Sequence, residues 1–137
     1  MNANPTFAAS VAPARAASDR PAPARSSPPS LETFDVYQVS LQACRGCASI
    51  VPSLSAILRD QLLRASSSVV LNVAEGFGSF SRGVKRRHYE IARGSATECI
   101  AVLDLASALG CGDAIGDARM LFTRVAMMLA KLLARFR

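Results

Sequence analysis

This sequence of 137 residues lacks several features on which common protein activities depend. It has a single histidine, His88, which leaves little for a Ser-His-Asp triad, and no Gly-x-Ser-x-Gly motif, so hydrolase activity has no support. Its longest run without a charged residue, from Met1 to Ala14, contains two prolines and is too short to span a bilayer. No segment alternates polar and apolar residues with period two, as a half-buried strand would. We therefore expect an all-α protein that is not an enzyme and has no membrane partner.

Cysteine is scarce as well, with four residues in the chain. Cys44 and Cys47 form C-R-G-C inside a helical run with no strand before it, whereas a thioredoxin-like redox pair follows a strand. Cys99 and Cys111 do not fit the spacing of a zinc site. Residues 1–9 have neither the basic start nor the apolar run of a secretory signal. We expect four reduced thiols that serve in packing, and a cytoplasmic location.

The composition changes sharply near residue 30. Residues 1–30 hold six of the seven prolines, together with repeated Ala, Ser and Arg and no apolar period, which predicts a disordered basic tail. Residues 31–137 contain long periodic runs, broken at Pro52, between Gly76 and Gly83, and between Gly110 and Gly116. These breaks divide the second region into four segments.

Each of the four segments carries apolar residues at steps of three or four, which place them on one face of a helix. Four helices of roughly 20 residues joined by short turns predict an up-down-up-down antiparallel four-helix bundle. The predicted core faces are Phe34, Tyr37, Leu41, Cys44 and Ala48 in the first segment; Leu58, Leu62, Ala65, Val69 and Val73 in the second; Tyr89, Ala92, Ala96, Cys99, Leu103 and Ala106 in the third; and Leu121, Val125, Met128, Leu132 and Phe136 in the fourth.

The ends of these helices have recognisable signals. Ser53 or Ser55 is suited to cap the start of the second helix, and Asp113 the start of the fourth. Pro52 and Gly110 are expected to end the first and third. The second closes at two glycines, which we interpret as left-handed helix caps rather than as a phosphate-binding loop; these are Gly76 and Gly78.

Two motifs carry a resemblance to a known family. The second segment contains Leu63-Arg64-Ala65 and N-x-A-E-G-F-G from Asn72 to Gly78, and the third contains I-A-x-G-S-A-x-E from Ile91 to Glu98. This pair resembles the four-helix-bundle proteins encoded by intervening sequences in bacterial large-subunit ribosomal RNA genes, over about residues 31–137. Val70 and Ser79 stand where that family usually has a proline and a basic residue.

The resemblance also implies partners. The family is similar in fold to the accessory variability determinant of diversity-generating retroelements, a basic homopentamer that partners a reverse transcriptase and its template RNA. By resemblance, the chain is therefore expected to form a ring-shaped homo-oligomer, a pentamer, that binds RNA or DNA and assists a reverse transcriptase.

The charge of the chain points in the same direction. It has 16 Lys and Arg against 10 Asp and Glu, a net charge of +6 and a pI near 9.8, which favours anionic partners. A helix dipole disfavours cations at a helix start, so the basic cluster at the start of the third segment predicts phosphate binding. The alternative is a solvated face in which Glu90 pairs with a neighbouring arginine. The cluster consists of Arg82, Lys85, Arg86, Arg87 and Arg93.

His88, beside Tyr89, is a further candidate for nucleic-acid contact, because its ring can stack on a base while its neighbours bind phosphates. A surface or interface histidine is the alternative. A di-iron bundle is excluded, because it needs two Glu-x-x-His pairs and Lys85 stands three residues before His88. We expect no metal and no cofactor.

The remaining motif residues are interpreted as structural. Asn72, Glu75 and Glu98 are expected to bond to backbone, to Arg64 or Arg93, or across subunits. Glu75 lies in the second segment and Glu98 in the third, so their carboxylates can face one another across the bundle. Gly94 and Ser95 are small side chains in mid-helix, which suggests a close approach of a neighbouring helix. An apolar stripe in the fourth segment indicates either core or a subunit interface; it comprises Met127, Met128, Leu129, Leu132 and Leu133.

Two functions follow from these observations. The first is a non-enzymatic, basic, homo-oligomeric accessory protein that binds nucleic acid by phosphate neutralisation. The second is a protein-only oligomeric scaffold, in which the small-residue and Met-rich faces assemble subunits and the positive charge is incidental. Salt separates the two, because added salt weakens phosphate binding steeply and does not weaken apolar assembly.

Overall fold

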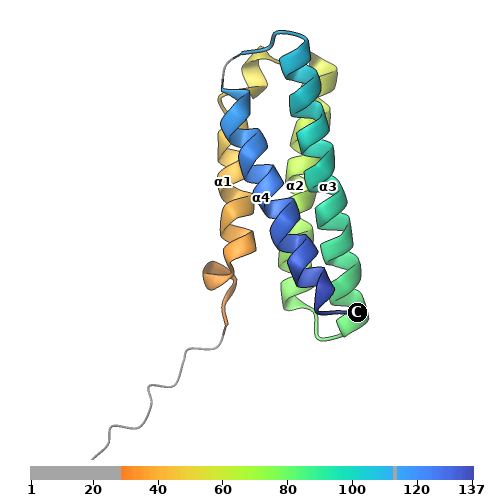
Figure 1. Ribbon diagram of the computed structural model, residues 1–137. Coiled ribbons are helices and arrows are strands. Elements are labelled where there is room, and N and C mark those ends of the chain that lie inside the picture. The colour runs from red at the N-terminus through yellow and green to blue at the C-terminus, as the bar shows by residue number, and fades with distance from the viewer. Residues whose placement is uncertain (1–28, 113) are drawn as a thin grey trace, which may run out of the picture.

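The computed structural model describes residues 29–112 and 114–137, and this part of the chain is helical with no strand (Figure 1). The expected tail, apart from its last two residues, lies outside the described residues. The α-helices are α1 (Asp35–Cys47), α2 (Ala56–Gly78), α3 (Arg82–Ala108) and α4 (Ile115–Ala134), with short 3-10 helices η1 (Leu31–Thr33) and η2 (Val51–Ser53). The prediction of an all-α protein with four helices is confirmed.

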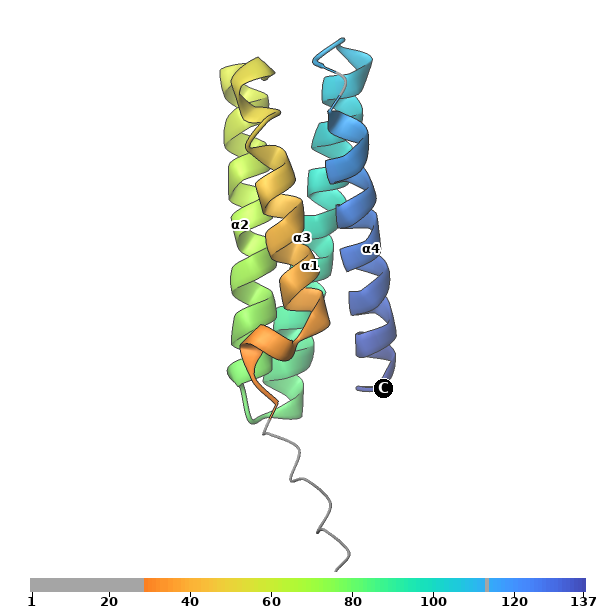
Figure 2. The same cartoon turned by 90° about the vertical axis from the view of Figure 1, so that its left-hand side faces the viewer.

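The four helices run up, down, up and down along one common axis (Figures 1 and 2). Each packs on its neighbours in the order α1, α2, α3, α4, and α4 closes the bundle against α1. The pair α2 and α3 makes the most extensive contact and holds both family motifs. None of the described helices is long and apolar enough to cross a membrane.

The helix ends follow the sequence signals in part. Ser55 caps α2, because its hydroxyl oxygen accepts a hydrogen bond from the backbone N–H of Leu58 at 3.4 Å. Gly110 ends α3 with a φ of +78°, which a residue with a side chain rarely adopts. α1 has 13 residues and ends at Cys47, well before Pro52, so it is shorter than predicted. Ala114 holds the N-cap position of α4, and Asp113 lies outside the described residues.

The predicted core faces of the two central helices are confirmed. Every residue of the predicted α2 face and every residue of the predicted α3 face is buried. These residues meet along the axis of the bundle, with fully buried Leu62 and Val69 on α2 and Ala96 and Leu103 on α3. Their periodicity was unambiguous because the positions on either side of each stripe are mostly polar.

The predicted core faces of α1 and α4 are wrong by about one residue. The predicted α1 residues are half-buried or, at Ala48, exposed, and Val125 is the one predicted α4 residue that is fully buried. A shift of one residue turns a helix by 100°. Small residues turn inward on α1 and let it lie close to its neighbours, while Phe34 and Tyr37 pack at the margin. The buried residues are Val36, Val39, Ser40, Ala43 and Cys47 on α1, and Ile115, Ala118, Phe122, Val125 and Leu129 on α4.

The Met-rich stripe of α4 divides between core and surface. Leu129 is fully buried, and Met128, Leu132 and Leu133 are partly buried against the core. Met127 is 59% exposed and lines a groove with Met120, which is also exposed. Most of the stripe therefore belongs to the core of the bundle.

The expected roles of three glycines are corrected by the structure. Gly76 and Gly78 lie inside α2 with ordinary helical backbone, and Ser79 caps the helix with a φ of −74°, so neither is a left-handed cap. A Cβ at Gly76 would lie 2.5 Å from Cε1 of Tyr89, so this glycine is needed for close packing against α3. Nothing lies within 4 Å of a Cβ at Gly94, so no helix of the described chain approaches it closely.

Candidate nucleic-acid interface

The basic cluster begins directly after a short turn between α2 and α3. The Ser79 hydroxyl donates to the carbonyl of Glu75 at 2.7 Å, which closes α2. The Ser81 hydroxyl accepts from the backbone N–H of Val84 at 3.4 Å, which opens α3. The turn between them contains only three residues, 79–81. The two serines thus place the first cations of α3 beside the last carbonyls of α2.

Lys85 is used within the fold. Its ammonium donates to the carbonyl oxygens of Gly76 at 3.1 Å and Phe77 at 2.9 Å, and its side chain is half-buried. These carbonyls lie in the last turn of α2, where the helix dipole is negative. Lys85 is unfavourably placed with respect to the dipole of its own helix and favourably placed with respect to that of α2.

Arg82 has a comparable role at the end of α4. Its guanidinium donates to the carbonyl of Arg135 at 3.0 Å and lies 5.5 Å above the ring centroid of Phe136. The last residues of the described chain therefore lie beside the start of α3, as Figure 1 shows. Sequence reasoning did not find this contact, because no local pattern connects residue 82 with residue 135.

Three cations of the cluster project from the outward side of α3. Arg86 pairs with Glu90 at 2.9 Å, one turn later on the same helix, and both side chains are about half exposed. Arg87 and Arg93 are exposed and have no side-chain hydrogen bond or ion pair with any described residue. We call Arg86, Arg87 and Arg93 the basic strip. The pair of Arg86 with Glu90 is the one that the alternative, a solvated face, predicts, while Arg87 and Arg93 remain available to an anionic partner.

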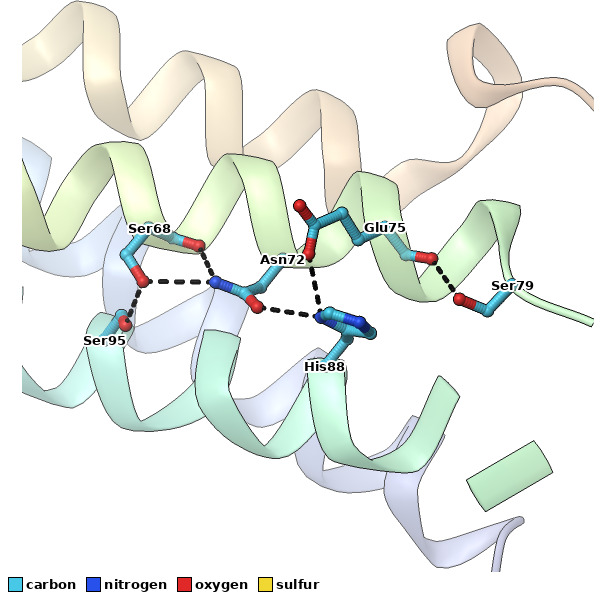
Figure 3. A network of polar contacts seen from close by, with 6 residues as sticks. All are labelled: Ser68, Asn72, Glu75, Ser79, His88 and Ser95. Atoms are coloured by element: carbon cyan, nitrogen blue, oxygen red, sulfur yellow. Dashed lines mark hydrogen bonds and ion pairs between the residues drawn. The ribbon is translucent and has the colours of Figure 1, made fainter. Parts of the chain in front are cut away.

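His88 lies in a polar network that joins α2 and α3 (Figure 3). Its Nδ1 is 3.0 Å from Oδ1 of Asn72 and 3.0 Å from Oε2 of Glu75. The amide nitrogen of Asn72 donates to the carbonyl of Ser68 at 2.9 Å, so the amide oxygen faces His88 and Nδ1 is a donor. The Ser68 hydroxyl in turn lies 2.8 Å from that of Ser95 on α3.

This network gives the two motifs a common physical role. N-x-A-E-G-F-G supplies Asn72 and Glu75, and I-A-x-G-S-A-x-E supplies Ser95. His88 is 24% exposed and held on one ring edge, which favours a structural role over base stacking. Glu98 is exposed and forms no side-chain bond with the described residues, so the partner of Glu75 across the helices is His88. Asn72 bonds to backbone, which was one of the expected alternatives, whereas Glu75 contacts His88 and not Arg64 or Arg93.

The four cysteines are free thiols. Cys44 donates to the carbonyl of Ser66 at 3.5 Å and Cys47 to that of Ala43 at 3.4 Å. Burial raises the pKa of Cys47 to about 12 and raises the pKa of Cys99 and of Cys44 as well. Protonated thiols are poor nucleophiles and poor metal ligands. Within residues 29–112 and 114–137, no group of three His, Cys, Asp or Glu side chains is arranged to hold a metal ion.

The fold and this surface define a small all-α bundle whose shared motifs join α2 to α3 and whose exposed cations follow that junction. A family model described as 23S rRNA-intervening sequence protein matches residues 32–131, and the chain belongs to this family. The resemblance inferred from the two motifs is thereby confirmed. No curated protein matches the chain.

Proposed function

We propose that this protein is a non-enzymatic, nucleic-acid-binding accessory protein that binds structured RNA through the basic strip. One observation carries the proposal: Arg86, Arg87 and Arg93 are exposed on α3 with one acidic neighbour, Glu90, while the adjacent Lys85 is used at the end of α2. The residues that stabilise the fold and the residues available to phosphate are thus separate. The resemblance to an accessory protein that partners a reverse transcriptase and its template RNA supports RNA over DNA.

The geometry of the strip suits a phosphate backbone. Seven residues of helix are two turns and rise about 10 Å, so Arg86 and Arg93 lie on one face of α3 with Glu90 between them. The exposed pair of Arg86 with Glu90 is worth only about 0–1 kcal/mol, so a phosphate can replace the carboxylate. The net charge of +6 adds long-range attraction to any polyanion. These contacts neutralise phosphate and do not read base sequence.

The test is the titration of a labelled RNA stem-loop with the full chain at salt concentrations from about 50 to 200 mM. The triple variant R86Q/R87Q/R93Q removes the basic strip and keeps good helix formers. The matched control R45Q/R64Q/R124Q removes three exposed arginines elsewhere and has the same net charge. We expect the strip variant to weaken binding at least about tenfold and to reduce the slope of log affinity against log salt by about three. Absence of wild-type binding at low salt, or equal losses in both triples, would contradict the proposal.

Self-association and a reverse-transcriptase partner belong to the same proposal. The resemblance supports a homo-oligomer, a pentamer, in which a repeated basic strip would multiply the positive field around the ring. Light scattering on the full chain measures the oligomeric state, and a mass of one chain would contradict it. Co-purification with a reverse transcriptase encoded beside the gene tests that partner, and the lack of any such neighbouring gene would remove it.

A protein-only scaffold is the second candidate function, and one surface favours it. Leu63, Leu71 and Ile91 are exposed by 47%, 60% and 41% along α2 and α3, and the first two line a groove with Ser67 and Ser68. Exposed apolar side chains beside small polar ones are typical of a contact between subunits. Open space at Gly94 on the same outer side of α3 fits an approach from another chain.

The scaffold is tested by a matched pair of variants. L71K places a charge in the groove, and I57K places the same charge on a more exposed apolar residue at the start of α2, outside the groove. We expect L71K to lower the native mass and I57K to leave it unchanged. An oligomer that forms at high salt and binds no RNA at low salt would favour the scaffold over the RNA-binding function.

A further inference from the structure

Phe80, at the centre of the α2–α3 turn, is the most exposed large apolar side chain in the described part of the protein. Its relative exposure is 101%, so none of the residues that the structure describes covers the phenyl ring. The neighbouring aromatic residues behave differently: Phe34 lies 5.0 Å from Phe77, and Tyr89 lies 5.9 Å from Phe136, measured between ring centroids. Because the ring is not buried, Phe80 adds no hydrophobic stabilisation to the fold.

The turn holds this exposed ring on a well-ordered support. Ser79 and Ser81 have extended backbone, with ψ of 142° and 127°, and each bonds to an adjacent helix end. Lys85 fastens the start of α3 to the last carbonyls of α2 on the inner side. The backbone that carries the ring therefore loses little conformational freedom when the ring binds a partner.

The surroundings of Phe80 indicate the chemistry of that partner. Arg82 follows two residues later, and the basic strip begins one helical turn beyond it. Both neighbours of Phe80 are serines, which leave the faces of the ring open. An exposed aromatic ring beside arginines is the arrangement with which single-strand-binding proteins stack a base and hold the adjacent phosphates.

We propose that Phe80 stacks on an unpaired base of an RNA whose phosphates bind the basic strip. This inference rests on the proposed function and adds a substrate class, namely RNA with unpaired nucleotides in a loop, bulge or single strand. Bases within a regular duplex are already stacked and offer no free face to the ring. The aromatic contact adds affinity without reading sequence, because every base has a face on which a ring can stack.

The test compares an oligouridylate single strand, whose bases stack only weakly on one another, with a blunt RNA duplex of equal length, by fluorescence anisotropy with the full chain at low salt. Stacking is worth about 1–3 kcal/mol per base, so F80A is expected to weaken single-strand binding about 5- to 150-fold. Its affinity for the duplex and its salt slope are expected to match the wild type. F80W is expected to restore the affinity, and since the chain has no other tryptophan, the single strand should quench its fluorescence.

The outcomes separate this inference from the proposed function. If the wild type binds both RNAs and F80A binds the single strand equally well, the stacking role is overturned and the phosphate-binding role stands. If the wild type binds neither RNA at low salt, both fail. If F80A also lowers the native mass of the protein, Phe80 is a contact between copies of the chain, and the stacking role is overturned.

Discussion

At the two ends of the bundle, the last carbonyl groups of a helix accept hydrogen bonds from different kinds of donor. At the α3–α4 end, backbone groups satisfy the last carbonyls of α3: the N–H of Cys111 bonds to Ala106 and that of Gly110 to Ser107, both at 3.0 Å. This requires positive φ at Gly110. At the α2–α3 end, the side chains of Lys85 and Ser79 donate hydrogen bonds to the last carbonyls of α2, and no positive φ is needed.

The charges differ between the two ends in the same way. At the α3–α4 end, Arg119 pairs with Asp104 through two hydrogen bonds, and this contact lowers the pKa of the Asp104 carboxyl. At the α2–α3 end, cations exceed acids on α3, and two of them are used at the C-termini of α2 and α4. An antiparallel bundle can therefore place cations at the start of one helix, because the negatively polarised ends of neighbouring helices lie beside it. A basic helix start is therefore not by itself a sign of a phosphate site.

The largest expected effect concerns the glycines of the motif end. Gly76→Ala forces a methyl group against the Tyr89 ring, and we expect the free energy of unfolding to fall by about 1–2 kcal/mol after the gain in helix propensity is allowed for. Gly94→Ala, in open space on α3, is the matched control and is expected to stabilise the chain by about 0.5–1 kcal/mol. Urea unfolding measures both. A Gly76→Ala protein as stable as the wild type would show that the close approach of Tyr89 is unimportant.

The next effect concerns the residues that satisfy the last carbonyls of α2 and α3, and the loss of stability when each is replaced. Lys85→Met keeps the apolar stem and removes two hydrogen bonds to α2, which we expect to cost about 1 kcal/mol. Gly110→Ala at the opposite end is expected to cost about 1–2 kcal/mol, because its left-handed backbone conformation is unfavourable for alanine. Thermal unfolding by circular dichroism compares the two variants.

Arg87, a cation without a partner among the described residues, provides the control for Lys85. Arg87→Met makes the same charge change two residues from Lys85, and since Arg87 bonds to none of the described residues, we expect a stability change within about 0.5 kcal/mol. RNA affinity is expected to show the reverse order, with a larger loss for Arg87→Met than for Lys85→Met. Equal effects of the two variants on both properties would mean that the cluster does not divide into structural and binding cations.

The last effect concerns pH and the buried thiol at the end of α1, and it is absent at neutral pH. The pKa of Cys47 is about 12 in the folded chain, above its ordinary value of 9.0. The unfolded chain therefore loses this proton first, so the free energy of unfolding is unaffected below pH 9 and falls as the pH rises from 9 towards 12. Cys47→Ala is expected to flatten this decline in urea unfolding measured at a series of pH values. An equally steep decline in the variant would assign it to other groups.

Much of the fold could be predicted from the sequence, and the limits have a physical cause. The stripes of α2 and α3 were predicted correctly because polar residues flank them, whereas α1 carries apolar residues on two adjacent faces. On α1 the periodicity fits both faces, and only the shape of the neighbouring helices selects Val36 and Ala43 over Tyr37 and Leu41. The same ambiguity led to the wrong choice between Leu121 and Phe122 on α4.

The candidate site was predicted less completely. The basic cluster and Glu90 as a neighbour of Arg86 followed from spacing along one helix. The partners of Lys85, Arg82 and His88 lie on other helices, and no local sequence pattern predicts these contacts. The exposed ring of Phe80 was also missed, because an aromatic residue outside an apolar period gives no signal of where it points.

By itself, the sequence determined the helical class, the division into four segments, the α3 end at Gly110, and the two motifs that place the chain in its family. These properties depend on interactions within one turn or one helix, which periodicity and capping residues express directly. Only the tertiary structure decided which faces of α1 and α4 turn inward, why Gly76 must be a glycine, and which cations remain on the surface. Those properties depend on side chains brought together from different helices, and their physical cause is the packing of the four helices against one another.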